Sequence, residues 1–366
     1  TSNICTAQAL LSIMAAAYGI YHGPDGIKHI GERTLKFANA FASKIKTKFE
    51  ILSDQFFDTV TINTKDKTKE IYAKALEFKV NLRLIENHGL SVSFDETTRI
   101  EDVNNLFQIF GLQDQIKNLD DVTISSIDDT LKRTSKYLTH QVFNSYHSET
   151  EMLRYLKSLE DKDIALNRSM IALGSCTMKL NAVAEMIPVT WPEFGNIHPF
   201  APLDQAKGYL KMFSDLEKML SEITGFTGIS LQPNAGAQGE YAGLMVIRKF
   251  HIENGDENRN ICLIPSSAHG TNPASAQMAG MKVVVVDCDK DGNVDLEDLT
   301  KKAELHSKSL AALMVTYPST HGVFEEHIKE ICEVIHQHGG QVYMDGANLN
   351  ALVGIAKPGN FGPDVC

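Results

Sequence analysis

Asp345 stands at the end of a short apolar stretch and is followed at once by small residues. Residues 342–344 have the composition of a buried strand, and Gly346 and Ala347 leave room for another molecule beside the backbone. Parallel α/β sheets bind their cofactors at the carboxyl ends of the strands. A carboxylate there would keep a pyridine nitrogen protonated and make the ring an electron sink, with Ala347 packed beneath it.

A glycine-rich turn, Gly236, Ala237 and Gln238, opens a predicted helix further upstream. Small residues there expose backbone N–H groups, and the helix dipole adds to their attraction for an anion such as phosphate. The turn contains neither a Walker loop nor a dinucleotide-binding fingerprint. From these residues alone, a phosphate site and a tight turn without a ligand are equally good interpretations.

Two more motifs, at residues 266–273 and 316–322, follow predicted strands and bring His269 and Thr316 to the same edge. The imidazole stands between small residues, so it would lie flat against a planar group. A lone histidine is more often structural, and Thr316 equally begins an ordinary proline-containing turn. Taken with the glycine-rich turn and Asp345, the motifs outline a pyridoxal phosphate site: an anion cradle, a stacking ring, hydroxyls and a strand-end acid.

A polar loop at residues 174–181, which contains Thr177 and Lys179, precedes these motifs. Its position would allow it to close over a site. Its residue types fit a structural loop as well, and they indicate no ligand role by themselves.

Alternating strands and helices from residue 171 onward would position the motifs. Strands are predicted at residues 228–231, 260–264, 282–286, 311–316 and 341–344. Helices are predicted at residues 237–253, 274–279, 296–307 and 325–338. This alternation is typical of an α/β architecture with a mostly parallel sheet.

The first part of the chain has a different pattern. Residues 1–115 are predicted to form an α+β small domain, and residues 116–170, which are polar, a helical connector to residues 171–366. In the small domain helices are predicted at 7–21, 26–46, 67–78 and 100–110, and strands at 56–62, 81–85 and 90–94. The last two strands are expected to form a hairpin.

Composition excludes several classes of protein. The net charge of −11 argues against general nucleic-acid binding. The sequence has no apolar run of 18 residues, so no membrane span is expected. The six cysteines show no C-x-x-C pair or metal-ligand spacing, which predicts reduced thiols and no metal site. The chain starts at Thr1 and stops at Cys366 in an apolar pair, so we expect a piece of a longer protein.

Several segments together resemble the glycine-cleavage-system P-protein family, whose members are pyridoxal phosphate enzymes of the aspartate-aminotransferase fold, fold type I. The matching segments are residues 1–8, 174–179, 232–240, 268–273, 316–322 and 345–348. The family's long form has two homologous halves. The resemblance implies that residues 1–115 close the first half and that residues 171–366 are part of the pyridoxal phosphate-binding large domain of the second.

The resemblance also implies roles for individual residues. It assigns the phosphate to Gly236, Ala237 and Gln238, ring stacking to His269, cofactor orientation to Thr316, the ring nitrogen to Asp345, and substrate proximity to Thr177 and Lys179.

The covalent anchor of the cofactor is not among these residues. In the family a Schiff-base lysine follows the Asp-Gly-Ala-Asn segment in a His-Lys pair, and no such pair lies between Asp345 and Cys366. Lys357 precedes a proline in a context that does not match. The chain by itself is therefore expected to be inactive.

For the intact enzyme the resemblance implies that glycine is decarboxylated and that its aminomethyl group passes to the lipoyl arm of the H-protein. The full-length protein is expected to form a homodimer, in the mitochondrial matrix of a eukaryote or the cytoplasm of a bacterium. Two alternatives stay open. One is another fold-type-I enzyme, an aminotransferase or a cysteine desulfurase, although the small-domain-first order argues against it. The other is a cofactor-free structural or regulatory half.

Overall fold

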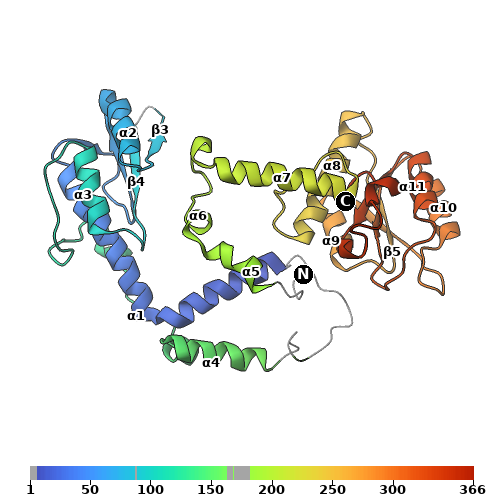
Figure 1. Cartoon of the computed structure of the whole chain (residues 1–366), viewed down its shortest axis with the longest axis horizontal. Coiled ribbons are helices and arrows are strands. Elements are labelled where there is room, and N and C mark those ends of the chain that lie inside the picture. The colour runs from blue at the N-terminus through green and yellow to red at the C-terminus, as the bar shows by residue number, and fades with distance from the viewer. Residues whose placement is uncertain (1–5, 87–88, 163–167, 169–181) are drawn as a thin grey trace. The chain divides into compact units, whose positions relative to one another are not determined.

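The computed structural model describes residues 6–86, 89–162, 168 and 182–366 (Figure 1). The chain divides into two compact units, residues 14–163 and residues 164–366 together with residues 1–13. The domain boundaries expected at residues 115 and 170 stay a prediction.

The first unit is an α+β structure, as its pattern predicted. Its sheet is antiparallel, with strand order β1-β2-β4-β3. The strands are β1 (Glu50–Ile51), β2 (Thr59–Asn63), β3 (Arg83–Ile85) and β4 (Gly89–Ser93). The helices are α1 (Thr6–Ile45) from residue 14 onward, α2 (Thr68–Glu77) and α3 (Ile100–Ile109). The predicted hairpin is confirmed, because β3 pairs with β4.

Helix α1 contains the two helices that the sequence predicted. Gly23 has a φ of 64° and a ψ of −178°, and this conformation interrupts the helical backbone just before Pro24. Positive φ is inexpensive only for glycine, and proline cannot continue the hydrogen-bond pattern of a helix. The break therefore follows from these two residues.

Phenylalanines fill the core of the first unit. Phe41 is fully buried, and its ring centroid lies 6.2 Å from that of Phe107, 5.5 Å from that of Phe110 and 5.6 Å from that of Phe94. Such ring pairs add about 0.5–1.5 kcal/mol each to the area they bury. This cluster fixes α1 and α3 against the sheet.

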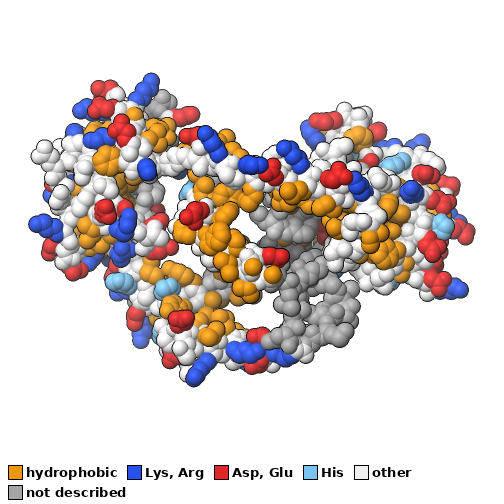
Figure 2. Space-filling model, in the orientation of Figure 1, with side chains coloured by type: hydrophobic (Ala, Val, Ile, Leu, Met, Phe, Trp, Pro, Cys, Tyr) orange, Lys and Arg blue, Asp and Glu red, His pale blue; other side chains and the backbone are white. Residues whose placement is uncertain are grey.

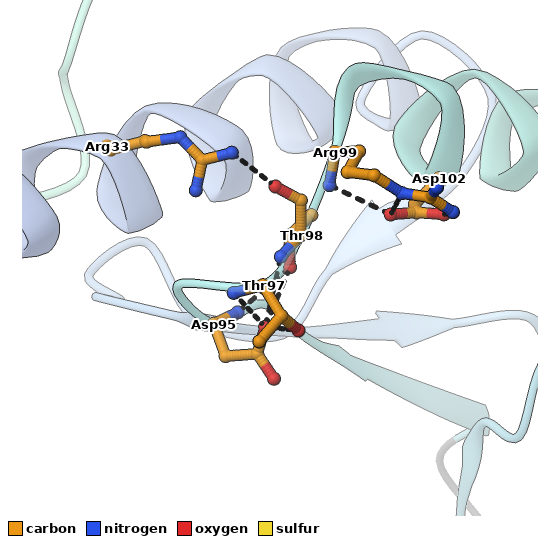
Figure 3. Close-up of polar contacts among 6 residues, drawn as sticks. All are labelled: Arg33, Asp95, Thr97, Thr98, Arg99 and Asp102. Carbon is orange, nitrogen blue, oxygen red and sulfur yellow. Dashed lines mark hydrogen bonds and ion pairs between the residues drawn. The ribbon is translucent and has the colours of Figure 1, made fainter. Parts of the chain in front are cut away.

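A capped turn connects β4 to α3 (Figure 3). Asp95 Oδ1 accepts hydrogen bonds from the backbone nitrogens of Thr97 and Thr98, at 2.9 and 3.1 Å, and from both hydroxyls. Arg33 on α1 donates to the Thr98 carbonyl at 2.6 Å, and Arg99 N donates to Asp102 Oδ2 at 2.8 Å. Partial burial would raise the pKa of the Asp95 carboxyl, but the hydrogen bonds from Thr97 and Thr98 outweigh it and lower this pKa.

The expected connector contains one α-helix, α4 (Glu149–Glu160), and 3₁₀ turns at Asp129–Leu131 and Gln141–Asn144. A capping box of Ser148 and Glu151 starts α4. Upstream of it, Asn39 of α1 donates to Ser126 Oγ at 2.9 Å and accepts from Ser125 N at 3.0 Å. These bonds hold the beginning of the expected connector against α1 within the first unit.

The second unit is built on a parallel sheet, which confirms the predicted α/β architecture. The sheet has the order β6-β5-β7-β8, and every pair in it is parallel. The strands are β5 (Ile261–Pro265), β6 (Lys282–Val286), β7 (Leu310–Thr316) and β8 (Gln341–Asp345). The helices are α5 (Val183–Met186), α6 (Pro192–Gly195), α7 (Lys207–Thr224), α8 (Gly236–Glu253), α9 (Thr271–Met278), α10 (Leu296–Leu305) and α11 (Ile328–Gln337).

Helices cover both faces of this sheet (Figure 1). Leu263 and Leu313 pack with residues of α10 and α11 in one cluster. Their neighbours Cys262 and Met314 pack with residues of α8 and α9 in another. This alternation follows from strand geometry, in which successive side chains point to opposite faces. Strands buried on both faces have nearly continuous apolar sequences, which explains why β5 and β7 were predictable.

The strand predicted at residues 228–231 is wrong. The structure has no strand there, and these residues are exposed or half-buried. A strand is stabilised by a partner for its backbone groups, and none of the described strands pairs with residues 228–231. The apolar character of Ile229 and Leu231 was not enough to predict that partner.

Within the described ranges, no helix is long and apolar enough to cross a membrane. The same part of the chain has no cluster of three or more His, Cys, Asp or Glu side chains that could hold a metal ion.

Candidate functional site

Three of the predicted residues lie at or just beyond the carboxyl ends of three parallel strands. Thr316 is the last residue of β7 and lies opposite Asp345, the last residue of β8. His269 follows the end of β5, which pairs with β7. The sheet therefore gathers these side chains at its carboxyl edge, as their spacing predicted.

The carboxylate of Asp345 is half-buried and oriented by two donors. Ala347 N donates to Oδ1 at 3.0 Å, and Asn272 Nδ2 lies 3.4 Å from Oδ2. Asn272 belongs to the first turn of α9 and is only 1% exposed. Sequence reasoning placed Asn272 in a motif but gave it no role, because its contact with β8 depends on the tertiary structure.

Two buried polar atoms next to Asp345, Thr316 Oγ1 and Asn272 Oδ1, have no hydrogen-bond partner among the residues that the structure describes. Both residues are more than nine-tenths buried. Leaving a buried polar group unpaired costs about 1–3 kcal/mol, so such groups usually have a ligand or an ordered water as partner. These two atoms are what a site for a polar ring beside Asp345 would contain.

The beginning of α8 suits an anion. Its N-cap, Ala235, makes no side-chain capping bond, and no acidic residue lies in the first turn. The first N–H groups of a helix have no partner inside the helix. A Cβ added at Gly236 or Gly239 would meet no atom of the described residues within 4 Å, so these residues leave space beside the turn. Gln238 Oε1 accepts from Asn234 N at 2.9 Å, which closes the turn before the helix.

A close contact sets the position of α8 on the sheet. A Cβ at Gly243 would lie 2.5 Å from Tyr343 Cε2. Only glycine allows α8 to approach β8 so closely, and this approach brings the beginning of the helix toward the edge where Asp345 lies.

His269 is exposed, and its Nδ1 lies 2.8 Å from Thr271 Oγ1. The Thr271 hydroxyl also contacts Glu240, a buried residue of α8 that sequence reasoning missed. An acidic residue in the predicted helix after the glycine-rich turn was visible in the sequence, but its burial was not.

The remaining predicted residues lie on either side of these motifs along the chain. Ala347, two residues after Asp345, is exposed. Thr177 and Lys179 lie outside the described residues. Lys357, which the sequence context excluded as the anchor, forms an ion pair with Glu222 of α7, with 2.6 Å between Nζ and Oε1.

Comparison with known proteins assigns the family. The family model described as glycine cleavage system P-protein matches residues 1–110 and 112–366. A protein from Pelagibacter ubique named glycine dehydrogenase (decarboxylating) is 68% identical over 367 residues, which cover 100% of this chain and 39% of that protein. A protein of the same name from Cupriavidus metallidurans is 58% identical over 369 residues, which cover 100% of this chain and 38% of that protein. The chain thus spans about two fifths of the length of these relatives.

The fold agrees with this assignment. A crystal structure of a glycine decarboxylase (P-protein) of the glycine cleavage system, in inhibitor-bound form, matches with a TM-score of 0.51 and 17% identity over 73% of this chain and 56% of that one. At this identity the likeness shows a shared fold, and it confirms the expected aspartate-aminotransferase-like large domain preceded by an α+β small domain. The chain belongs to the glycine cleavage system P-protein family.

Proposed function

We propose that this chain is part of a glycine decarboxylase that uses pyridoxal phosphate and passes the aminomethyl group of glycine to the lipoyl arm of the H-protein. Membership of the family and the names of the relatives support the reaction. The observation that supports the cofactor is the Thr316 hydroxyl opposite Asp345, which is buried and has no partner within the described residues. It supports a bound polar ring at the carboxyl edge of the sheet.

The phosphate would be held at the beginning of α8, by the backbone N–H groups of Gly236, Ala237 and Gln238. The open space at Gly236 and the absence of an acid from the first turn support this assignment. His269 would lie beside the ring and Ala347 beneath it.

Asp345 would keep a proton on the ring nitrogen. Its two donors, Ala347 N and Asn272 Nδ2, hold the carboxylate in one orientation, so little rearrangement is needed when a cation forms beside it. The Thr316 hydroxyl would orient the ring from the neighbouring strand. When bound, pyridoxal phosphate supplies a protonated ring that takes up the electron pair left when a bond to the α-carbon of glycine breaks.

The partners and the compartment belong to the same proposal. The complete protein would be an oxidoreductase with the lipoyl disulfide of the H-protein as acceptor, and it would form a homodimer. Thr177 and Lys179 would lie near the substrate. The two relatives described above come from bacteria, which supports the cytoplasm over the mitochondrial matrix.

The test uses a polypeptide that continues past Cys366 to the length of the relatives. With pyridoxal phosphate it is expected to show an absorbance band near roughly 400–430 nm and to release carbon dioxide from glycine. The 366-residue chain is expected to release none, because the anchoring lysine would lie beyond it. A complete protein that stays colourless and inactive would overturn the proposal and favour the cofactor-free alternative.

A further inference from the structure

Glu240 is a buried carboxylate of α8 that accepts two hydrogen bonds from α9. It is only 6% exposed. Thr271 Oγ1 donates to Oε1 at 2.8 Å, and Ser275 Oγ donates to Oε2 at 2.9 Å. Thr271 and Ser275 are four residues apart and therefore lie on one face of α9, so a single side chain holds the first turn of this helix, residues 271–275.

An apolar contact between α8 and α9 would be less costly than this carboxylate. Burying a charged group is unfavourable unless hydrogen bonds replace those it made with water. Burial raises the pKa of the Glu240 carboxyl, and the hydrogen bonds from Thr271 and Ser275 offset part of that effect. Apolar contacts have no preferred direction, whereas the two hydrogen bonds fix the rotation of α9 about its own axis. The carboxylate therefore indicates that the orientation of this turn matters.

Asn272 follows Thr271 in the same turn and reaches β8. Its Nδ2 lies 3.4 Å from Asp345 Oδ2, and a carboxylate only accepts hydrogen bonds, so the amide must turn its NH₂ group toward Asp345. The side chain of Asn272 is buried, with 1% of the residue exposed. Because 3.4 Å is long for a hydrogen bond, a small rotation of α9 would break this contact.

A second contact fixes α8 against the same strand. A Cβ at Gly243 would lie 2.5 Å from Tyr343 Cε2, and Gly243 stands three residues after Glu240, on the same face of α8. Helix α8 thus contacts β8 at Gly243, Glu240 fixes α9 to α8, and Asn272 returns from α9 to β8. These contacts join the three elements in a closed set that ends at Asp345.

We propose that Glu240 is a positioning residue for Asp345: it holds the first turn of α9 in the rotation that lets Asn272 orient the Asp345 carboxylate. The inference rests on the proposed function only for the cation that Asp345 would meet. The arrangement of Glu240, Asn272 and Asp345 is a property of the chain.

The test is the hydrogen exchange of asparagine side-chain amides in the 366-residue chain, followed by ¹H–¹⁵N NMR with ¹⁵N-labelled asparagine. Asn272→Ser identifies the signals of Asn272. Glu240→Met removes both hydrogen bonds to α9 and is expected to speed exchange of the Asn272 amide by about 5-fold or more. Glu240→Gln is expected to keep exchange slow, because its side-chain amide can still bond both hydroxyls although the charge is gone.

Two controls separate positioning from general stability. Leu263→Val removes a buried methylene from the core on the opposite face of the sheet, so it destabilises the same unit but should leave exchange at Asn272 unchanged. Asn39 is the internal reference, because its Nδ2 donates to the Leu35 carbonyl at 2.9 Å in the first unit. Equal acceleration in Leu263→Val and Glu240→Met would show that only stability changes, and it would overturn the inference.

Two further results would also overturn it: unchanged exchange in Glu240→Met, or fast exchange in Glu240→Gln. If Glu240→Met does not fold, Ser275→Ala decides instead. It removes one of the two hydrogen bonds and should speed exchange at Asn272 by a smaller factor, and no change would contradict the inference. Thr271 is less suitable for substitution, because its backbone nitrogen also donates to His269 Nδ1 at 3.3 Å.

These measurements need neither pyridoxal phosphate nor glycine. A negative result at Asn272 therefore leaves the absorbance test of the longer protein untouched, and failure of cofactor binding leaves the exchange result standing.

Discussion

Thr316 and Asp345 lie directly opposite one another at the carboxyl ends of β7 and β8. In the part of the chain that the structure describes, the buried hydroxyl of Thr316 has no partner, while the carboxylate of Asp345 is oriented by Ala347 and Asn272. Thr316 thus has a hydroxyl that lacks a hydrogen bond, and Asp345 has a carboxylate held in an orientation in which it could accept a hydrogen bond from a cation. An unpartnered buried hydroxyl beside an oriented carboxylate is what a binding site for a polar ligand requires.

Replacement of Thr316 by valine should raise the stability of the ligand-free chain and lower the affinity of the longer protein for the cofactor. The substitution removes an unpaired buried hydroxyl, so we expect the ligand-free chain to gain about 1 kcal/mol in free energy of unfolding. In the longer protein the affinity for pyridoxal phosphate should fall about 5- to 30-fold, for the loss of one hydrogen bond. Urea denaturation and equilibrium dialysis measure the two effects.

Thr300 is the control for this experiment, because its hydroxyl already donates to the Leu296 carbonyl at 2.8 Å. Thr300→Val should leave cofactor affinity unchanged. A Thr316→Val protein that binds the cofactor as tightly as the wild type would show that the hydroxyl does not touch it.

Addition of one methyl group should have opposite effects at two positions of α8. Gly243→Ala places a Cβ 2.5 Å from Tyr343 Cε2, and such overpacking should lower the free energy of unfolding by about 1–2 kcal/mol. Gly239→Ala meets nothing within 4 Å and should raise it by about 0.5–1 kcal/mol through helix propensity. Hydrogen exchange of the α8 amides in urea measures both. Equal effects of the two substitutions would contradict the close packing of α8 on β8.

Much of the second unit was predictable from its sequence. Strands β5 and β7 are apolar on both faces and are bounded by turn residues, so local composition identified them. The segment 228–231 has a similar sequence pattern, but whether it forms a strand depends on whether a neighbouring strand is available to pair with it. Asn272 and Glu240 were missed for a related reason: their importance comes from burial against other elements, and the periodicity of one segment does not contain that information.

The turn at Asp95 should make the first unit sensitive to acid. The pKa of this carboxyl is lowered in the folded state by the hydrogen bonds from Thr97 and Thr98, despite the opposing effect of partial burial. Its contribution is therefore present above the unfolded-state value, near pH 4, and disappears as the pH falls through the lower folded value.

Asp95→Asn should thus destabilise the first unit by about 1 kcal/mol at pH 7, at the low end for a charged hydrogen bond because the turn is exposed to solvent. The difference from wild type should vanish toward pH 2, as measured by urea denaturation across that range. A difference that is independent of pH would show that the charge of Asp95 plays no part.

The buried thiols should be unreactive in the folded chain. Burial raises the pKa of Cys262 to about 12 and that of Cys332 to about 12. At pH 8 only about one thiol in 10⁴ would then be the reactive thiolate. Treatment with iodoacetamide followed by mass spectrometry should find both residues unmodified until urea is added. Cys288, which is half-buried, is the internal control and should react in the native chain.

In the proposed site, Asp345 holds a proton on the ring nitrogen of a bound cofactor. Its most direct test is the ¹⁵N NMR shift of pyridoxal phosphate labelled at the ring nitrogen and bound to the longer protein. The wild type should show a protonated pyridinium at pH 8, and Asp345→Asn should show the unprotonated ring, with glycine decarboxylation lowered by about 10²-fold or more. An unprotonated ring nitrogen in the wild type, or a pyridinium that persists in Asp345→Asn, would contradict the role given to Asp345.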